Sequence, residues 1–260
     1  MGSKTTFSNF RDFGGLEIPG GRKFKDGMIY RCSRLAPKNA EEKKILQGLK
    51  LDCVLDFRTP AEVKEKPDKL PKGVEYVNVS VFGDTKFQIL APTRKSKLAL
   101  LGCTDSQFDE IMQGIRDSYA YMPYARHAYK ELFARLNAGK KLAFHCTAGK
   151  DRTGVAAMII ELALGRTREQ AHEQYMLSNQ KRAGKNGKLM KMLKLLPLSD
   201  KFYECVNYST RTHDELFDIA YDAIFSKYPT IDEFLLKEYG VTAENIKAWR
   251  DTYTEEVKAK

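Results

Sequence analysis

Residues 140–164 read KKLAFHCTAGKDRTGVAAMIIELAL, and this stretch decides the fold. Residues 140–145 form a short apolar run that is typical of a strand. Residues 153–164 are apolar on nearly every side, as in a helix that is buried at the centre of a protein. The sequence therefore predicts a strand that turns tightly, through residues 146–152, into a buried helix.

The rest of the chain alternates predicted strands with predicted helices. Short apolar or alternating runs indicate the strands, and amphipathic patterns indicate the helices. This alternation predicts an α/β fold with a central, mostly parallel sheet flanked by helices. Strands are expected at 28–32, 51–57 and 74–81, and helices at 40–49 and 124–136.

Length and composition exclude several other classes of protein. The chain has 260 residues, of which 42% are hydrophobic and 30% charged, so it is not disordered, collagen-like or a coiled coil. No stretch approaches the roughly 20 apolar residues that a membrane span needs. Because the sequence contains no internal repeat and no low-complexity linker, residues 1–260 are expected to form one domain.

The net charge indicates which classes of partner the protein binds, and the spacing of the cysteines indicates whether a zinc site is expected. The chain carries 44 Lys and Arg against 34 Asp and Glu, a net charge of +10, which favours anionic partners such as phosphates, nucleic acid or an acidic membrane surface. A nucleic-acid partner is not expected, because no basic and aromatic binding platform is evident. The five cysteines lack C-x-x-C spacing, so no zinc site is expected and the thiols are expected to be reduced.

The amino terminus leaves the location open. Residues 1–20 lack the hydrophobic segment of a signal peptide, so a cytoplasmic location is expected for the chain as given. A start that was replaced during cloning can have lost such a signal, and the protein would then be secreted. Residues 1–6, MGSKTT, formally fit the N-myristoylation pattern, or they are an initiator followed by a cloning remnant.

The loop at residues 146–152 has the features of an anion-binding site. Its backbone N–H groups can point into one concavity, and the following helix adds partial positive charge at its N-terminus. Arg152 can hold two phosphate oxygens with its planar guanidinium. The same field is expected to lower the pKa of Cys146, giving a thiolate poised for in-line attack on phosphorus without a metal or other cofactor. The alternative is that Cys146 is an inert buried thiol.

These residues resemble a known signature. The stretch HCTAGKDRTG at 145–154 resembles the H-C-x5-R-[ST]-G signature of the protein tyrosine phosphatase superfamily. Its AGKDRTG form is similar to the bacterial tyrosine and lipid phosphatases of the secreted mycobacterial and listerial type. Residues 82–125 and 180–215 match poorly, and the resemblance implies variable helical lid insertions there. Supporting matches are NFRDFGG at 9–15, YRCSRL at 30–35, LDFR at 55–58 and YMLSN at 175–179.

The resemblance implies roles for the loop residues. Cys146 is the nucleophile that forms a phosphocysteine intermediate, and Arg152 binds the phosphate. Lys150 either contacts a second phosphate, as in phosphoinositide-active members, or is a solvated loop lysine. The remaining phosphate-binding groups belong to Thr147, Ala148, Gly149 and Lys150.

The general acid is less clearly indicated. Typical tyrosine phosphatases carry it in a Trp-Pro-Asp loop, and this chain has no such tripeptide. In the bacterial subgroup the aspartate beside the arginine, here Asp151, is the acid and later activates the water. Asp117 is the second candidate. Asp151 can instead be a helix N-cap.

Three nearby residues are expected to support the loop. His145 is expected to hold it by hydrogen bonding, and Thr153 can donate a hydrogen bond to the Cys146 thiolate. Arg58 is expected to form a structural ion pair, for instance with Glu62, although it can also join the phosphate site.

A basic segment follows between residues 181 and 196. It predicts a helix that is a lid over the site, a contact with an anionic membrane, or a solvated helix whose apolar face is core. Gly184 and Gly187 would be its hinges if it moves. One face carries Leu189, Met192, Leu193 and Leu196, and the opposite face carries Lys188, Lys191 and Lys194.

Two classes of function follow. The first is a cysteine-dependent phosphomonoesterase that hydrolyses phosphotyrosine in proteins, with phosphoserine, phosphothreonine and phosphoinositides as further substrates. The second is a catalytically idle module that binds phosphate or phosphoinositide. The intact pair of Cys146 and Arg152 favours the enzyme, because a pure binding module needs no thiolate.

Overall fold

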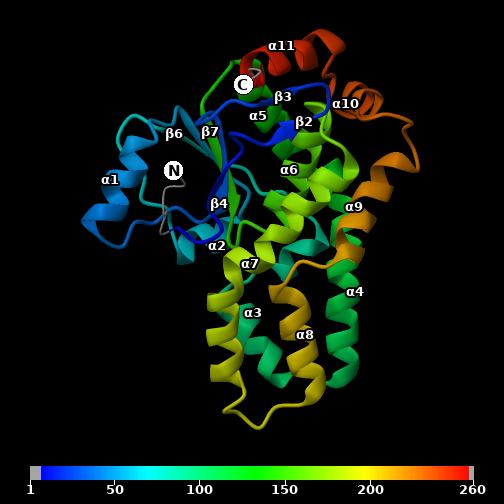
Figure 1. Ribbon diagram of the computed structural model, residues 1–260. Helices are drawn as coiled ribbons and strands as arrows, with labels where there is room; N and C mark the ends of the chain where they lie inside the picture. Colours follow the sequence, from blue (N-terminus) through cyan, green and yellow to red (C-terminus); the bar gives the residue numbers. More distant parts are fainter. Residues whose placement is uncertain (1–6, 258–260) are drawn as a thin grey trace.

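The computed structural model describes residues 7–257 and contains the predicted sheet (Figure 1). Four neighbouring strands are parallel, and a short antiparallel strand lies at one edge. The prediction of a mostly parallel α/β sheet is therefore confirmed. In spatial order the strands are β1 (Arg11–Asp12), β4 (Ile29–Ser33), β7 (Leu142–Cys146), β5 (Cys53–Asp56) and β6 (Glu75–Asn78).

The central strands are buried on both faces, because successive side chains point to opposite sides of a sheet. Phe144 and Leu55 belong to the main core on one face, whereas Ala143 and Val54 belong to a smaller core on the other. The main core is covered by α5 (Arg126–Asn137), α6 (Arg152–Ala163), α9 (Asp214–Phe225), α10 (Ile231–Tyr239) and α11 (Ala243–Tyr253), and the smaller one by α1 (Ala40–Gly48).

The helix after β7 is buried along its whole length, as its apolar sequence predicts. Every residue of α6 from Arg152 to Ala163 is buried. Because α6 is fixed on all sides, the loop that joins it to β7 is anchored at both ends. A second, small antiparallel sheet lies apart from the loop and consists of β2 (Glu17–Ile18), β3 (Arg22–Phe24) and β8 (Thr254–Glu256).

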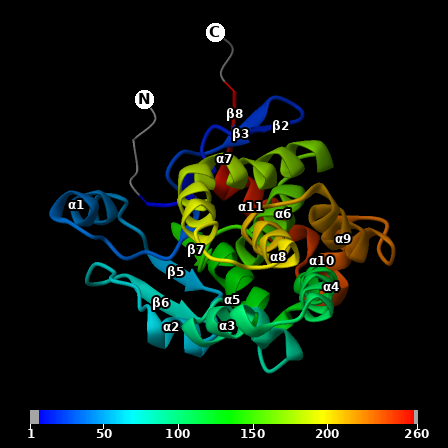
Figure 2. The same ribbon diagram turned by 90° about the horizontal axis from the view of Figure 1, so that it is seen from below.

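Both segments expected to be insertions are helical. With the long α4 and α7 they form an arm below the carboxyl ends of the parallel strands (Figure 1), and Figure 2 views the molecule from this side. The arm has its own apolar cluster, built on Phe108, Met112, Phe202, Cys205 and Val206. Its elements are η1 (Lys86–Leu90), α3 (Arg94–Ala99), η2 (Leu100–Gly102), α4 (Asp105–Tyr121), η3 (Met122–Tyr124), α7 (Arg168–Leu193) and α8 (Asp200–Thr210).

Two local features were expected in these segments. Gly184 and Gly187, the hinges expected if the basic segment moves, lie inside the continuous helix α7. The strand expected at 74–81 is shorter, since β6 covers only Glu75–Asn78, although backbone hydrogen bonds from Val79 to Asp56 and from Val81 to Phe57 continue beyond it. None of the helices in residues 7–257 has the length and apolar character required to cross a membrane. The N-myristoylation pattern at 1–6 lies outside the described residues.

Candidate active site

Cys146 ends β7 and begins the loop that leads into α6. Its side chain is buried, with the residue only 1% exposed, while Thr147 and Ala148 on the loop are partly exposed. α6 begins at Arg152, so the helix axis starts directly beside the sulfur. This is the strand, turn and helix arrangement that the sequence predicts.

Two carbonyl groups of the loop, those of Gly149 and Ala148, accept hydrogen bonds from other parts of the chain. The carbonyl of Gly149 accepts hydrogen bonds from Nδ2 of Asn9 at 2.7 Å and from Nη2 of Arg31 at 3.0 Å. The carbonyl of Ala148 accepts from Asn9 at 3.2 Å and from Nη1 of Arg182 at 3.3 Å. Within residues 7–257, the amides of 147–152 donate to no other group of the protein. They are free to bind an anion, as in other backbone nests.

Glycine is required at position 149 for two reasons. Its φ is +68°, in the left-handed region that other residues adopt at a cost. A Cβ atom there would also lie 2.2 Å from the carbonyl oxygen of Cys32 on β4. The loop is therefore pressed directly onto the backbone of the neighbouring strand.

The surroundings of Cys146 favour the thiolate. Burial alone would raise the pKa of the thiol, and so does the charge of Asp151, but the nearby guanidinium of Arg152 and the amide and hydroxyl of Thr153 outweigh both and hold the pKa below its usual value. The buried Thr153 hydroxyl has no other partner within the described part of the chain. The thiolate is thus present at pH values above this lowered pKa and is lost as the pH falls through it.

Removing the Thr153 hydroxyl is therefore expected to raise the pKa of Cys146. Thr153→Val has nearly the same shape, and a hydrogen bond to a charged group is worth about 1.5–3 kcal/mol. A titration of thiolate absorbance in the ultraviolet, with Cys146→Ser as the blank, should show the midpoint at higher pH in Thr153→Val. Thr153→Ser keeps the hydroxyl and should retain the wild-type midpoint. An unchanged midpoint in the valine variant would contradict this assignment.

Arg152 is held in place by Glu62, which sequence reasoning did not place in the site. The two side chains form a forked ion pair, with Nη1 to Oε2 at 2.7 Å and Nη2 to Oε1 at 2.9 Å. Thr147 donates to the same carboxylate from the loop. Burial alone would raise the pKa of Glu62, but Arg152 and these hydrogen bonds lower it to about 2. The ion pair therefore contributes to stability above the ordinary pKa of 4.5, and this contribution is lost as the pH falls toward 2.

Arg58 forms the expected structural ion pair, but Glu62 is not its partner. Arg58 instead binds Asp56, with Nη2 to Oδ2 at 2.6 Å, and Asp68 at 2.9 Å. The guanidinium of Arg58 is thus taken up by Asp56, at the end of β5, and by Asp68, whereas Glu62 pairs with Arg152. His145 joins this buried group.

His145 supports the loop from behind, as expected. Its Nε2 lies 3.1 Å from Asp68, and its Nδ1 lies 3.2 Å from the carbonyl oxygen of Cys146. Burial alone would lower the pKa of His145, but Asp56 and Asp68 raise it. Asp56, Asp68 and His145 offer atoms at metal-ligand spacing, yet the guanidinium of Arg58 already supplies the positive charge between the two carboxylates.

The side chain of Asp151 does not cap helix α6. The residue occupies the N-cap position of α6, but its side chain makes no capping hydrogen bond. Oδ1 instead accepts from the hydroxyl of Tyr119 at 2.6 Å and from Nζ of Lys150 at 2.5 Å. The carboxylate is partly exposed, so it can reach a substrate. The N-cap alternative is therefore wrong.

Lys150 is buried, and this excludes the alternative of a solvated loop lysine. Besides Asp151, its ammonium donates to the carbonyl of Arg211 at 2.9 Å. Behind the aspartate, the hydroxyl of Tyr119 lies 2.8 Å from that of Tyr175. Lys150 and the two tyrosines thus fix the position of the carboxylate.

Asp117 is not brought to the loop. It lies on α4 two residues before Tyr119, and so on another side of that helix. Its hydrogen bond is with Gln113 on the same helix, at 2.8 Å. Asp151 is therefore the aspartate that the structure places beside Cys146 and Arg152.

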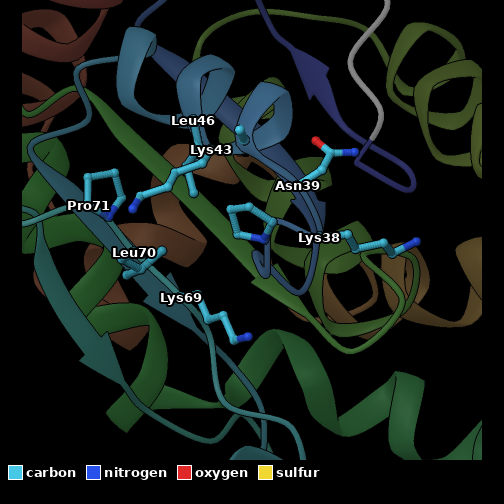
Figure 3. A pocket seen from close by; sticks show the side chains of 9 residues that line it. Lys38, Asn39, Lys43, Leu46, Lys69, Leu70 and Pro71 are labelled. Carbon is cyan, nitrogen blue, oxygen red and sulfur yellow. The ribbon is translucent and has the colours of Figure 1, made fainter.

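One cavity lies elsewhere, next to α1 (Figure 3). It has a volume of about 340 Å³ and no lining residue from the loop at 146–152. It is lined by Pro37, Lys38, Asn39, Ala40, Lys43, Leu46, Lys69, Leu70 and Pro71.

Comparison with known proteins identifies the family of this site. Residues 3–255 match the tyrosine phosphatase family, which is nearly the whole chain. The chain belongs to this family. The resemblance to the protein tyrosine phosphatase superfamily is thereby confirmed.

The chain is also similar to individual proteins, at lower levels of sequence identity. A Cupriavidus necator protein whose name places it among the tyrosine-protein phosphatases is 36% identical over 180 residues, which are 68% of this chain and 63% of that protein. The chain thus spans less than two thirds of that relative. PtpB of Mycobacterium tuberculosis, named a triple specificity protein phosphatase, is 24% identical over 245 residues, 84% of this chain and 88% of PtpB. A crystal structure of P. aeruginosa TpbA covers 85% of this chain and 98% of its own, at 14% identity and a TM-score of 0.30.

Proposed function

We propose that the protein is a cysteine-dependent phosphomonoesterase. The observation that carries this proposal is a thiol of lowered pKa, surrounded by backbone amides without protein partners and by the guanidinium of Arg152. Membership of the tyrosine phosphatase family supports it. The sulfur of Cys146 attacks phosphorus in line, and the bond to the leaving oxygen breaks. Amides and guanidinium stabilise the equatorial oxygens in the transition state.

Asp151 supplies and retrieves the proton in this proposal. It protonates the leaving oxygen as the phosphocysteine forms, and then takes a proton from the water that attacks the same phosphorus. The second step releases inorganic phosphate and regenerates the thiolate of Cys146. The contacts from Tyr119 and Lys150 support this role, because they hold one carboxylate oxygen and leave the other for the substrate.

Changing Asp151 to Asn is expected to slow a poor leaving group far more than a good one. A positioned general acid contributes about 10²–10⁴-fold, and a good leaving group needs little of it. We expect kcat/KM to fall by about 10²–10³-fold for phenyl phosphate and by much less for p-nitrophenyl phosphate. Equal losses on both substrates would remove Asp151 from the acid role. Asp117→Asn is the matched control and should leave both values unchanged.

Phosphotyrosine in proteins is the proposed main substrate. Phosphoserine, phosphothreonine and phosphoinositides are proposed as further substrates, and the name of the mycobacterial relative, a triple specificity phosphatase, supports broad specificity. Basic residues near the loop also support substrates with more than one phosphate. Burial lowers the pKa of Lys185, and so do the charges of Arg182, Lys38, Lys66 and Arg34. Phosphoinositides would be met at an anionic membrane surface.

The second candidate function is a phosphate-binding module without turnover. The backbone amides of the loop and Arg152 favour it, because they can bind a phosphate group whether or not turnover follows. The lowered pKa of Cys146 argues for the enzyme, because a binding module gains nothing from a second negative charge under the phosphate. Turnover of p-nitrophenyl phosphate separates the two. The cytoplasmic location and the absence of a nucleic-acid partner stay predictions.

A further inference from the structure

Exposed apolar side chains gather at the helical arm. Nine large apolar residues of the described chain are exposed, and six of them lie in two segments of this arm. Leu195 is 83% exposed, Met192 59% and Leu196 45%, all at the far end of α7 or just after it. The other three of the six are Ile89, Leu98 and Leu101, which lie in or next to α3.

One side of α7 extends from the loop at 146–152 to the exposed residues at the end of the helix. Residues three or four positions apart share a side of a helix, so Lys181, Lys185, Lys188 and Met192 form one stripe. Leu189 and Leu193 point elsewhere and pack into the cluster of the arm. The interpretation of this segment as a solvated helix whose apolar face is core therefore holds for Leu189 and Leu193 but not for Met192 and Leu196, which are exposed.

The basic residues at the end of α7 are separated from the acidic residues of the arm. The lysines at 181, 185, 188, 191 and 194 form no ion pair among residues 7–257. Apart from Glu169 and Glu173 in the first turns of α7, the acids of the arm belong to other helices, and two of them, Asp109 on α4 and Glu204 on α8, are paired with Lys201. Asp200 begins α8 and forms no ion pair with the lysines of α7 among the described residues. The α7 side therefore carries uncompensated positive charge.

We propose that the end of α7 docks on an anionic lipid bilayer. Met192, Leu195 and Leu196 enter the interface, and the lysines of α7 contact lipid phosphates. Charge complementarity favours this partner, because unpaired lysines next to protruding leucines match a surface that is anionic outside and apolar beneath. The leucines also project from the end of a helix and do not line a groove, which suits a deformable lipid surface better than a folded partner.

Docking of α7 would also bring the active site close to the membrane. This consequence rests on the proposed function. Arg182 contacts the loop carbonyl of Ala148, and Met192 is ten residues further along the same helix. At about 1.5 Å per residue, the two are about 15 Å apart along α7. The lysine stripe fills this interval. A phosphorylated lipid headgroup that rises from the bilayer would therefore meet positive charge along the way to Cys146.

Sedimentation with lipid vesicles tests the docking without requiring turnover. Wild-type protein is expected to bind vesicles of phosphatidylcholine with phosphatidylserine, to bind phosphatidylcholine alone far less, and to dissociate at high salt. The double variant Leu195→Glu with Leu196→Glu should lower binding by at least about tenfold. Lys188→Glu with Lys191→Glu should lower it by about fivefold or more per lysine. Leu236→Glu is the matched control, because Leu236 is an exposed leucine of α10 at the other end of the molecule (Figure 1).

The outcomes separate docking from catalysis. The two variants of α7 should hydrolyse p-nitrophenyl phosphate in solution as the wild type does, since these side chains lie outside the site. Equal binding to both kinds of vesicle, no binding to either, or an equal loss in Leu236→Glu would overturn the docking. A loss of phosphopeptide hydrolysis in solution without vesicle binding would assign the surface to a protein partner and would also overturn it. Vesicle binding without any turnover would leave the docking standing and remove the proposed function.

Discussion

Replacing Cys146 with serine is expected to abolish turnover of p-nitrophenyl phosphate. A serine hydroxyl ionises at a far higher pH than a thiol, and the groups that lower the pKa of Cys146 cannot make it an alkoxide at neutral pH. Loss of a covalent nucleophile costs on the order of 10⁴–10⁶-fold in kcat. The assay should contain a chelator, because amides and Arg152 provide the charge stabilisation and no loss is expected from removing metal ions.

The serine variant must be shown to be folded and to bind. Its thermal unfolding should match that of the wild type, since the change removes little from the core. It should still bind a phosphotyrosine peptide in calorimetry, because the amides and Arg152 are intact. Turnover that survives in the folded variant would rule out Cys146 as nucleophile, and binding without turnover in the wild type would favour the phosphate-binding module.

Changing Arg152 to lysine is expected to lower kcat/KM by about 10²–10³-fold. A lysine keeps the positive charge but cannot present two parallel N–H groups to the phosphate oxygens. Glu62 also loses its forked partner, so the midpoint of thermal unfolding should fall. Rates should therefore be measured well below that midpoint, with p-nitrophenyl phosphate as the substrate.

Glu62→Gln is the matched variant for this experiment. It removes the carboxylate charge from the pair and leaves the guanidinium fork of Arg152 in the site. A smaller loss of kcat/KM than in Arg152→Lys is expected, because only the positioning of Arg152 is weakened. An equal or larger loss in Glu62→Gln would show that the arginine acts mainly through its ion pair and not on the phosphate.

The sheet and the loop could be predicted because their signals are local. The apolar run before Cys146 and the wholly apolar helix after it specify a buried strand, a turn and a buried helix within one short stretch. The positions of Cys146 and Arg152 follow from that geometry. The bounds of the edge strand β6 are harder to predict, because its residues are mostly exposed and it pairs with only one strand of the sheet, β5.

The partners of the loop could not be predicted, because they come from distant parts of the chain. Asn9 holds the loop carbonyls from 140 residues away, and Glu62 reaches Arg152 across 90 residues. No spacing rule connects such pairs. The TPAE stretch at 59–62 indicates a helix start in which Thr59 and Glu62 form a capping box, and the structure shows this box. Tyr119 carried no signal, since nothing local marks a tyrosine whose partner is on another helix.

Trapping the intermediate tests the central claim most directly. The Asp151→Asn variant should be mixed rapidly with p-nitrophenyl phosphate, denatured in acid, digested and examined by mass spectrometry. In this variant the water that attacks the phosphocysteine lacks its base, so the intermediate should accumulate. We expect the peptide that contains Cys146 to gain the mass of one phosphoryl group on its sulfur, and the same peptide from Cys146→Ser to remain unmodified. Turnover by the same variant with no phosphate on that sulfur at any mixing time, or with the phosphate on another residue, would contradict the account.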